Sequence, residues 1–373
     1  MNSQIAGPWT GDQQLESEFN EVARLVYAGD SEWLPEDALQ LGFSFTKNNP
    51  YFSIGKVWRG FESKQARLAG FYDPRQLVDG ENVAYFGFWE TVNSYQTNLC
   101  LFNAFEDWAR KCGATRIYGP INFNTYGLYR IRTSHFDAPC FQGEPYNPEY
   151  YPTLLDSLGY SISSTYYSQF DGNLLSIRDS MRPQYESGLL KMENGFSRHD
   201  LTVEFWMDNI EAIYLLSEIV FQSNFAYTPI NIDIFRRVCG ESFISKADPH
   251  VSHVMLDNKN NKIAGMLLGF PSWGPLLKQG AAQRISASDI DFRKHFERLP
   301  KPRMVLAKTA GVAPEYRNRG LYSVMMYQLV ESAIDTGYSE YGAVLAKDDN
   351  VSLRMVNKIP NRRSYSLFWK KLS

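Results

Sequence analysis

The sequence has 373 residues, of which 44% are hydrophobic and 21% charged, a composition typical of a globular chain long enough for two domains. It contains no apolar run of about 18 residues or more, and residues 1–12 lack the basic-then-apolar order of a signal peptide, so neither a membrane span nor a secretory leader is expected. The four cysteines are scattered without a CxxC pair, which favours reduced thiols in a cytoplasmic protein over a metal site or a disulfide framework.

The net charge of −3 is unevenly distributed along the chain. Residues 1–175 hold 12 Lys plus Arg against 20 Asp plus Glu, whereas the remainder holds 26 against 21. A basic half suits an anionic cofactor and an acidic half suits a cationic substrate, although uneven surface composition explains the counts equally well. There is no dense basic stripe of the kind that binds nucleic acid.

The elements predicted in the first half alternate between strands and helices. Val83 to Val92 (VAYFGFWETV) is rich in β-branched and aromatic residues and predicts a buried strand. Asn93 or Ser94 caps the helix that follows, and Gly113 ends it. The remaining expected elements are a short strand at 115–118, a helix starting at Tyr146-Asn147-Pro148 and ending near Gly159, and a strand at 160–170.

The middle of the chain is expected to connect two halves. Residues 171–200 are polar, contain Pro183 and predict a helical connector or linker. Residues 203–225 have apolar residues at helical spacing, and 262–270 (KIAGMLLGF) predicts a strand. Residues 274–302 are expected to be an insertion that carries a helix.

The second half repeats the element order of the first. The expected elements are a strand at 303–312, a helix at 321–336 closed by Gly337, a strand at 341–346, a short helix from Asn350 to Lys358 and a strand at 364–370. No repeat is visible in the residues themselves, so the duplication is inferred from element order alone.

The loop between the 303–312 strand and the following helix carries the most informative motif. Pro314 stops the strand because it has no N–H, and Arg317-Asn318-Arg319-Gly320-Leu321-Tyr322 leads into the helix. Backbone N–H groups at a helix N-terminus, with the helix dipole, suit a pyrophosphate. Gly320 permits a positive φ or a close backbone approach, and the two arginines can bind phosphate oxygens.

This loop resembles that of the GNAT superfamily of acyl-CoA-dependent N-acyltransferases, in which Arg or Gln is followed after two residues by Gly, and after one more by Gly or Ala. Arg317 and Gly320 match, whereas Tyr322 occupies the last, normally small, position. The alternative is an ordinary strand–turn–helix with basic surface residues. The resemblance implies an α/β (α+β) fold of two tandem GNAT-like domains with mixed central sheets flanked by helices. The expected boundaries are 1–175 for a degenerate domain, 176–200 for a linker and 201–373 for the domain that binds acyl-CoA.

The resemblance also implies acetyl-CoA as co-substrate and no metal. In the family the cofactor strand and the next strand splay apart, and the pantetheine arm enters the gap. The implied cofactor-binding residues are Ala310, Val312, Arg317, Asn318, Arg319, Gly320, Leu321, Tyr322 and Asn350, although a helix cap explains Asn350 equally well.

The implied reaction is attack of an amine on a thioester. The Val312 N–H is the candidate that polarises the carbonyl. The helix after the second strand has no Tyr, so Tyr365 and Ser352 are the candidate acids. The 303–312 strand has no carboxylate, so a water or Glu90 is left as the base, with a solvated strand-end carboxylate as the alternative for Glu90.

The first half lacks an Arg-x-x-Gly loop, because Val92-Asn93-Ser94-Tyr95-Gln96 occupies that place. We therefore expect it to bind no CoA productively and to form a wall of the substrate cleft. Asn122, Asn124 and Tyr146 are the candidate substrate residues, with turn formation as the alternative role of the asparagines.

The function expected from these features is acetylation of a primary amine on a small cationic molecule. Size, two halves and the charge split are similar to the self-resistance N-acetyltransferases of cationic peptide–polyketide antibiotics. The alternatives are transfer of a longer acyl group or transfer to an amino acid during natural-product assembly, and a non-catalytic ligand-binding protein. A monomer or homodimer without nucleic-acid or membrane partners is expected.

Overall fold

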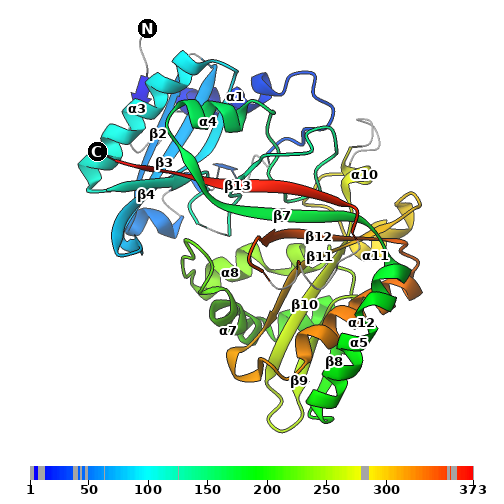
Figure 1. The fold of residues 1–373 in the computed structure, drawn as a ribbon. Coiled ribbons are helices and arrows are strands. Elements are labelled where there is room, and N and C mark those ends of the chain that lie inside the picture. Colours follow the sequence, from blue (N-terminus) through cyan, green and yellow to red (C-terminus); the bar gives the residue numbers. More distant parts are fainter. Residues whose placement is uncertain are drawn as a thin grey trace. The chain divides into compact units, whose positions relative to one another are not determined.

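A computed structural model describes residues 4–6, 13–36, 41–42, 44–46, 49–62, 64–124, 126–278, 285–350, 353 and 359–372. The chain divides into two compact units (Figure 1). Unit 1 comprises residues 1–165 and 364–373, and unit 2 comprises residues 166–363. The chain therefore passes from unit 1 into unit 2 within one strand, β7, and returns within its last strand, β13.

Unit 1 is a mixed sheet with helices on both faces. Its strands follow the order β1-β2-β3-β4-β5-β13, and only β4 and β5 run parallel. Its elements are β1 (Gln4–Ala6), α1 (Gln13–Val26), η1 (Pro50–Ser53), β2 (Lys56–Glu62), β3 (Ala66–Val78), β4 (Glu81–Thr91), α3 (Tyr95–Cys112), β5 (Arg116–Gly119), β6 (Ile131–Arg132), α4 (Tyr151–Ser157) and the greater part of β13 (Asn361–Lys371).

The core of unit 1 is unusually aromatic and lies mainly between the sheet and α3. Phe105 of α3 reaches β3 so closely that a Cβ on Gly70 would lie 2.5 Å from its ring, and at Gly60 of β2 the indole of Trp58 takes up the space in the same way. On the other face, α1 brings Phe19 against the guanidinium groups of Arg59 and Arg67. The abundant Phe and Tyr residues of the sequence therefore serve largely as core.

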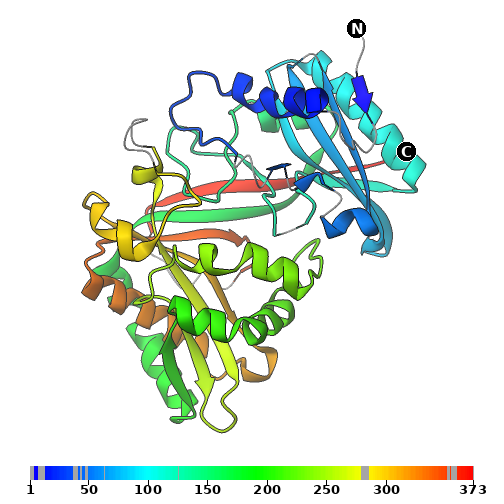
Figure 2. The same ribbon diagram turned by 180° about the vertical axis from the view of Figure 1, so that it is seen from behind.

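Unit 2 has the sheet order β7-β12-β11-β10-β9-β8, in which β11 and β12 run parallel. Helices α12 and α5 pack together on one face, and α7 covers the other (Figures 1 and 2). Its elements are β7 (Ser161–Asn173), α5 (Leu174–Met192), β8 (Phe196–Asp200), α6 (Val203–Asp208), α7 (Ile210–Phe221), α8 (Ile232–Val238), α9 (Glu241–Ile244), β9 (His253–Asp257), β10 (Ile263–Pro271), α10 (Gly274–Leu277), α11 (Phe292–His295), η2 (Phe296–Arg298), β11 (Met304–Val312), η3 (Pro314–Tyr316), α12 (Leu321–Thr336) and β12 (Glu340–Lys347).

Most of the strands and helices predicted from the sequence are present. The predicted helix at 321–336 is α12 with the same bounds, and Ser94 caps α3 by accepting a hydrogen bond from the Thr97 N–H. The helix expected from Tyr146 is wrong in its start, because α4 begins at Tyr151. The helix expected from Asn350 to Lys358 falls on residues of which only 350 and 353 are described.

The expected domain boundaries need correction. Residues 176–200 do not form a linker, because they form most of α5 and all of β8 inside unit 2. The last strand, which is expected in the second domain, pairs with β5 and β6 of unit 1. The continuous range 201–373 is therefore not a compact unit.

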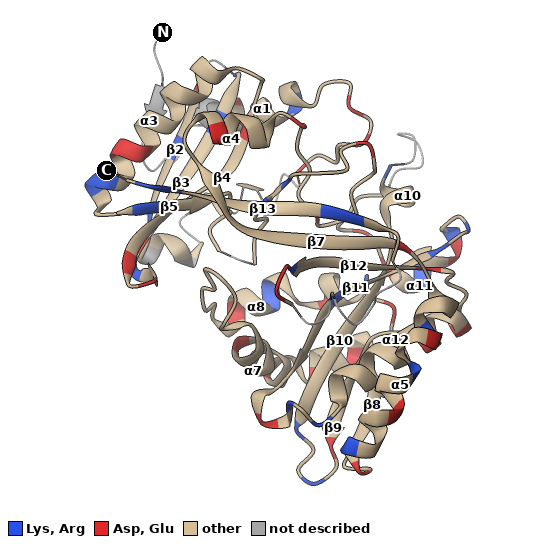
Figure 3. Cartoon of the chain, in the orientation of Figure 1, with Lys and Arg blue, Asp and Glu red and all other residues tan. Residues whose placement is uncertain are grey.

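The corrected boundaries also weaken the charge asymmetry. Unit 1 contains 14 Lys plus Arg against 19 Asp plus Glu, and unit 2 contains 24 against 22. The net charges are −5 and +2, a smaller contrast than the −8 and +5 obtained by dividing the chain at residue 175. Both signs of charge are interspersed along the ribbon of each unit (Figure 3).

Candidate active site

The site in unit 2 begins where β11 and β12 stop pairing. Their parallel ladder runs only from Met304 opposite Glu340 to Ala307 opposite Ala343, although both strands continue beyond it. The register of β11 against β10 shifts at the same place, so that Lys308 is the extra residue of a β-bulge. Bulges bend a strand and increase its local twist. The bulge therefore lies where the two parallel strands diverge, and the edge of β11 beyond it faces a gap in the ladder.

The backbone groups that face this gap belong to Ala310 and Val312. The Ala313 N–H donates to the Ala264 carbonyl of β10, and Val312 lies opposite Gly265. Because hydrogen-bonded and non-hydrogen-bonded pairs alternate in an antiparallel ladder, Gly311 and Thr309 also bond to β10. The N–H groups of Ala310 and Val312 consequently point toward β12, where the ladder has ended.

The loop at the start of α12 supplies further unused donors. Asn318 and Gly320 have positive φ values of 63° and 84°, which turn the chain into the helix. No side chain caps this helix. In the described part of the chain, no group accepts a hydrogen bond from the N–H of Arg319, Gly320, Leu321 or Ser323. The macrodipole of a 16-residue helix adds a positive potential there.

The two arginines of the loop have different surroundings. Arg317 is exposed, and its Nε donates to the Val312 carbonyl at 3.4 Å, which places it along the open edge of β11. The guanidinium of Arg319 lies 4.6 Å from the centre of the Phe196 ring in β8. Arg317 is therefore the better placed of the two to meet an anion, and a phosphate would have to compete with Phe196 for Arg319.

Two glycines bring α5 against the loop. A Cβ on Gly320 would lie 2.5 Å from both the Cα and the carbonyl oxygen of Gly188, which sits within α5. Gly320 therefore has two reasons to be glycine: its positive φ and this close approach. The sequence motif suggested the first reason, whereas nothing in it indicated the second.

Tyr322 departs from the small residue of the loop motif. It is half-buried, and it lies near Tyr341 of β12, since burial and the proximity of Tyr322 both raise the pKa of Tyr341. Its side chain thus extends toward β12. Ser323, the next residue, lies on the side of α12 that faces α5.

The structure describes two of the three remaining predicted residues of this site, Asn350 and Tyr365. Asn350 is exposed after β12, and its carbonyl accepts a hydrogen bond from the Leu353 N–H, as at the start of a helical turn. Ser352 lies outside the described residues. Tyr365 belongs to unit 1 and is fully buried, with its hydroxyl 3.8 Å from the Cys140 sulfur. A phenol sealed from solvent is poorly suited to protonate a departing thiolate.

The corresponding gap in unit 1 is filled by the protein itself. Strands β4 and β5 also stop pairing, after Tyr85 opposite Tyr118. Beyond that point, Ile121 N–H donates to the Phe86 carbonyl at 2.7 Å, and Phe88 N–H donates to Oδ1 of Asn122 at 2.7 Å. The edge that a pantetheine arm would use is therefore occupied.

Several backbone groups at the end of β4 and the start of α3 also have hydrogen-bond partners within unit 1. Thr91 donates its N–H to the hydroxyl of Tyr151, and its carbonyl accepts from the hydroxyl of Tyr150. Ser94 caps α3, and the Asn98 side chain donates to the Ser94 carbonyl. Unit 1 thus has the strand divergence, but the edge of β4 beyond Tyr85 already has hydrogen-bond partners within the described residues of unit 1.

The candidate substrate residues take structural roles or join one cluster. Asn122 plugs the gap, and Asn124 forms a turn by accepting a hydrogen bond from the Tyr126 N–H. The Tyr146 hydroxyl donates to Asp30 at 2.6 Å. The Tyr27 hydroxyl joins the two remaining candidates, since it donates to Glu90 Oε2 at 2.8 Å and lies 3.1 Å from the Tyr146 carbonyl oxygen.

Glu90 is half-buried, which differs from the fully solvated strand-end carboxylate that is the alternative for this residue. Its Oε2 accepts hydrogen bonds from both Tyr27 and Tyr151 at 2.8 Å. Burial raises the pKa of Glu90 to about 7, although the nearby Arg67 guanidinium opposes the shift. Arg67 itself is fully buried and forms an ion pair with Glu36 at 2.7 Å.

This raised pKa predicts that unit 1 loses stability as the pH rises. The folded state keeps the Glu90 proton up to about pH 7, whereas an unfolded glutamate loses its proton near pH 4.5. The stabilisation is complete below the unfolded pKa and is lost as the pH rises through 7, a change of roughly 3 kcal/mol. Hydrogen exchange of buried β4 amides at pH 5 and pH 8 measures it. Glu90→Gln should flatten this slope, whereas Glu149→Gln, an exposed control, should leave it unchanged.

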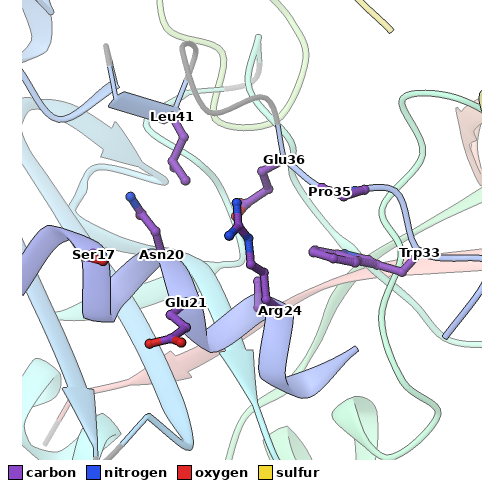
Figure 4. Close-up of a pocket in the computed structure, with 9 residues that line it drawn as sticks. Ser17, Asn20, Glu21, Arg24, Trp33, Pro35, Glu36 and Leu41 are labelled. Atoms are coloured by element: carbon purple, nitrogen blue, oxygen red, sulfur yellow. The ribbon is translucent and has the colours of Figure 1, made fainter. Parts of the chain in front are cut away.

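Unit 1 also contains a cavity of about 340 Å³ between α1 and the segment that follows it. Ser17, Asn20, Glu21 and Arg24 of α1 line one side, and Trp33, Pro35 and Glu36 line the other (Figure 4). None of these residues was singled out from the sequence. The cavity mixes acidic and basic side chains, and the carboxylate of Glu36 is already held by Arg67.

Membrane-spanning helices and clusters of metal ligands are both absent from the described residues. No helix among them is both long and apolar enough to cross a membrane. Nor do three or more His, Cys, Asp or Glu side chains gather there as metal ligands would.

Comparison with known proteins supports the architecture. No family model matches the sequence. Among curated proteins, the chain is 22% identical to the bacterial ceramide synthase of Caulobacter vibrioides over 318 residues, covering 77% of this chain and 80% of the relative. It is 24% identical to Protein YghO of Escherichia coli K12 over 141 residues, a match that spans only 36% of the length of each.

Among solved structures, a tandem GNAT protein from the clavulanic acid biosynthesis pathway superimposes with a TM-score of 0.50 at 11% identity, over 100% of this chain and 99% of that protein. A GCN5-related glucosamine N-acetyltransferase region of a fungal multi-domain enzyme superimposes with a TM-score of 0.52 at 13% identity, over 99% of this chain and 38% of that one. The chain therefore has the tandem GNAT fold expected from the loop motif, with mixed sheets flanked by helices.

Proposed function

We propose that this protein is an acyl-CoA-dependent N-acyltransferase whose acyl donor binds in unit 2. The observation that carries the proposal is the combination of the open edge of β11 with the uncapped N-terminus of α12. The pyrophosphate would accept hydrogen bonds from the N–H groups of the loop between Arg317 and Tyr322. The pantetheine arm would lie along the edge at Ala310 and Val312.

In the proposed reaction, a neutral primary amine attacks the thioester carbonyl. A C–N bond forms, the C–S bond breaks, and one proton moves from the nitrogen to the departing thiolate. The Val312 N–H, which faces the gap, would stabilise the charge that develops on the carbonyl oxygen. Water is the proton carrier that we propose between amine and thiolate.

We propose a long-chain acyl donor in preference to acetyl. The curated relative that aligns over most of the chain is named a ceramide synthase, and a ceramide is the fatty amide of a long-chain amino alcohol. Acetyl transfer to a small cationic amine, including self-resistance to an antibiotic, is the second candidate. The charge contrast that supported it is reduced to −5 against +2 when each unit is counted.

A donor panel tests the proposal. The purified protein is incubated with acetyl-, octanoyl- and palmitoyl-CoA and with long-chain amino alcohols, polyamines or amino acids, and free CoA thiol is measured. We expect release of CoA thiol that depends on the amine, with kcat/KM at least about tenfold higher for the longer donors. A higher value for acetyl-CoA with a small amine would establish the second candidate. Absence of turnover with every pair would favour a ligand-binding protein.

A further inference from the structure

The strongest unassigned feature of unit 2 is an open, solvent-exposed cavity of about 290 Å³ beside the proposed donor site. Its lining comes from two helices that pack side by side, α5 and the first turn of α12 (Figure 1). The lining residues are Pro183, Gln184, Ser187, Gly188, Lys191, Gly320 and Ser323. The residues from α5 recur at helical spacing, so one face of α5 forms a wall.

The chemistry of this lining suits an anion. It contains one cation, Lys191, and no carboxylate. Lys191 and Ser187 are exposed, and within the described residues the Lys191 ammonium forms no ion pair and the hydroxyls of Ser187 and Ser323 form no hydrogen bond to the protein. The N–H groups of Gly320 and Ser323 are unused there as well. The cavity therefore presents several donors and one positive charge to whatever occupies it.

The position of the cavity indicates which part of the donor it would hold. Tyr322 extends from α12 toward β12, on the side of the pantetheine gap, whereas Ser323 faces α5. The helix N-terminus thus separates the gap from the cavity. In coenzyme A the pyrophosphate likewise separates the pantetheine arm from the ribose 3′-phosphate. A donor with its pyrophosphate at this N-terminus would extend its nucleotide end toward α5.

We propose that α5 contributes to the acyl-donor site and that Lys191, with Ser187 and Ser323, binds the 3′-phosphate of the coenzyme A nucleotide. This inference rests on the proposed function. With such a site, the protein would prefer acyl-CoA to two related donors: an acyl-pantetheine, which lacks the nucleotide, and a dephospho-CoA thioester, which lacks only the 3′-phosphate. Gly188 is part of the arrangement, since it lets α5 approach the loop.

The test compares an acyl-CoA, its 3′-dephospho analogue and the matching acyl-pantetheine as donors. For the unchanged protein, removal of the 3′-phosphate should raise KM about tenfold with little change in kcat, as expected for loss of one charge-assisted contact. Lys191→Met should raise KM for acyl-CoA by a similar factor and leave the dephospho donor unaffected. Arg178→Met, which removes one positive charge at the other end of α5, should match the unchanged protein.

Two results would overturn the inference while leaving the proposed function intact. One is equal use of acyl-CoA and its dephospho analogue, and the other is an equal effect of Lys191→Met on both donors. Calorimetric titration with CoA and with dephospho-CoA gives a second readout that needs no turnover. Equal affinity for the two, or binding of neither, also contradicts the 3′-phosphate site, and binding of neither contradicts the proposed donor site as well.

Discussion

Gly320→Ala is expected to raise the dissociation constant for acyl-CoA about a hundredfold and to lower the stability of unit 2 by about 2 kcal/mol or more. Two costs combine at this position. Alanine is strained at a φ of 84°, and its Cβ would lie 2.5 Å from the backbone of Gly188. The helix start must shift, which disperses the N–H groups proposed to bind the pyrophosphate. Calorimetric titration and chemical denaturation measure the two effects.

Substitution of three other glycines of unit 2 measures the backbone strain and the close approach of the added Cβ separately. Gly337 ends the same helix at a φ of 90° with no atom within 4 Å of an added Cβ, so Gly337→Ala carries strain alone. Gly188→Ala carries the close approach alone, with contacts of 2.9 Å and 3.0 Å. Gly274→Ala carries neither. If Gly320→Ala binds acyl-CoA as tightly as Gly274→Ala, the loop is not the pyrophosphate site.

Deletion of residues 364–373 is expected to unfold unit 1, although these residues are the last in the chain. Residues 364–371 of β13 pair with β5 and β6, and Tyr365, Leu367 and Phe368 are almost fully buried in unit 1. Lys370 also forms an ion pair with the buried Glu106 at 2.8 Å. Each buried apolar side chain contributes about 2 kcal/mol to the free energy of unfolding. The combined loss is therefore comparable with the whole stability of an ordinary domain, about 5–15 kcal/mol.

Proteolysis of the shortened chain should cleave first between residues 1 and 165, as mapped by mass spectrometry. A point substitution tests the same idea without a deletion: Phe368→Ala should lower the free energy of unfolding of unit 1 by about 3–5 kcal/mol. The control is Lys371→Ala, at an exposed position of the same strand, which should lower it by less than about 0.5 kcal/mol. Initial cleavage in unit 2 instead would show that the last strand stabilises the other unit. Residues 1–165 should fold only when residues 364–373 are supplied.

The assignment of the donor site to unit 2 stays a prediction from a short motif, and unit 1 illustrates what such a motif leaves open. Both units have a strand that diverges from its parallel neighbour. In unit 1, Asn122 fills the gap with its side chain, a contact between residues 34 positions apart. An asparagine two residues after Gly119-Pro120 is compatible with a turn and with substrate binding, and neither of these expectations identifies the gap that Asn122 fills.

Local sequence determined the elements near the proposed site, because their signals are local. Pro314 ends a strand, Gly320 and Gly337 bracket a helix, and the apolar spacing between them is helical; the structure places α12 at the predicted residues. Tertiary structure alone decided which strand completes which sheet, that α5 is part of unit 2, and that the Glu90 carboxylate accepts hydrogen bonds from two tyrosines. These features depend on contacts between residues far apart in the chain. The spacing of residues along a sequence predicts helices and strands, but it does not indicate which strands pair or which side chains become buried together.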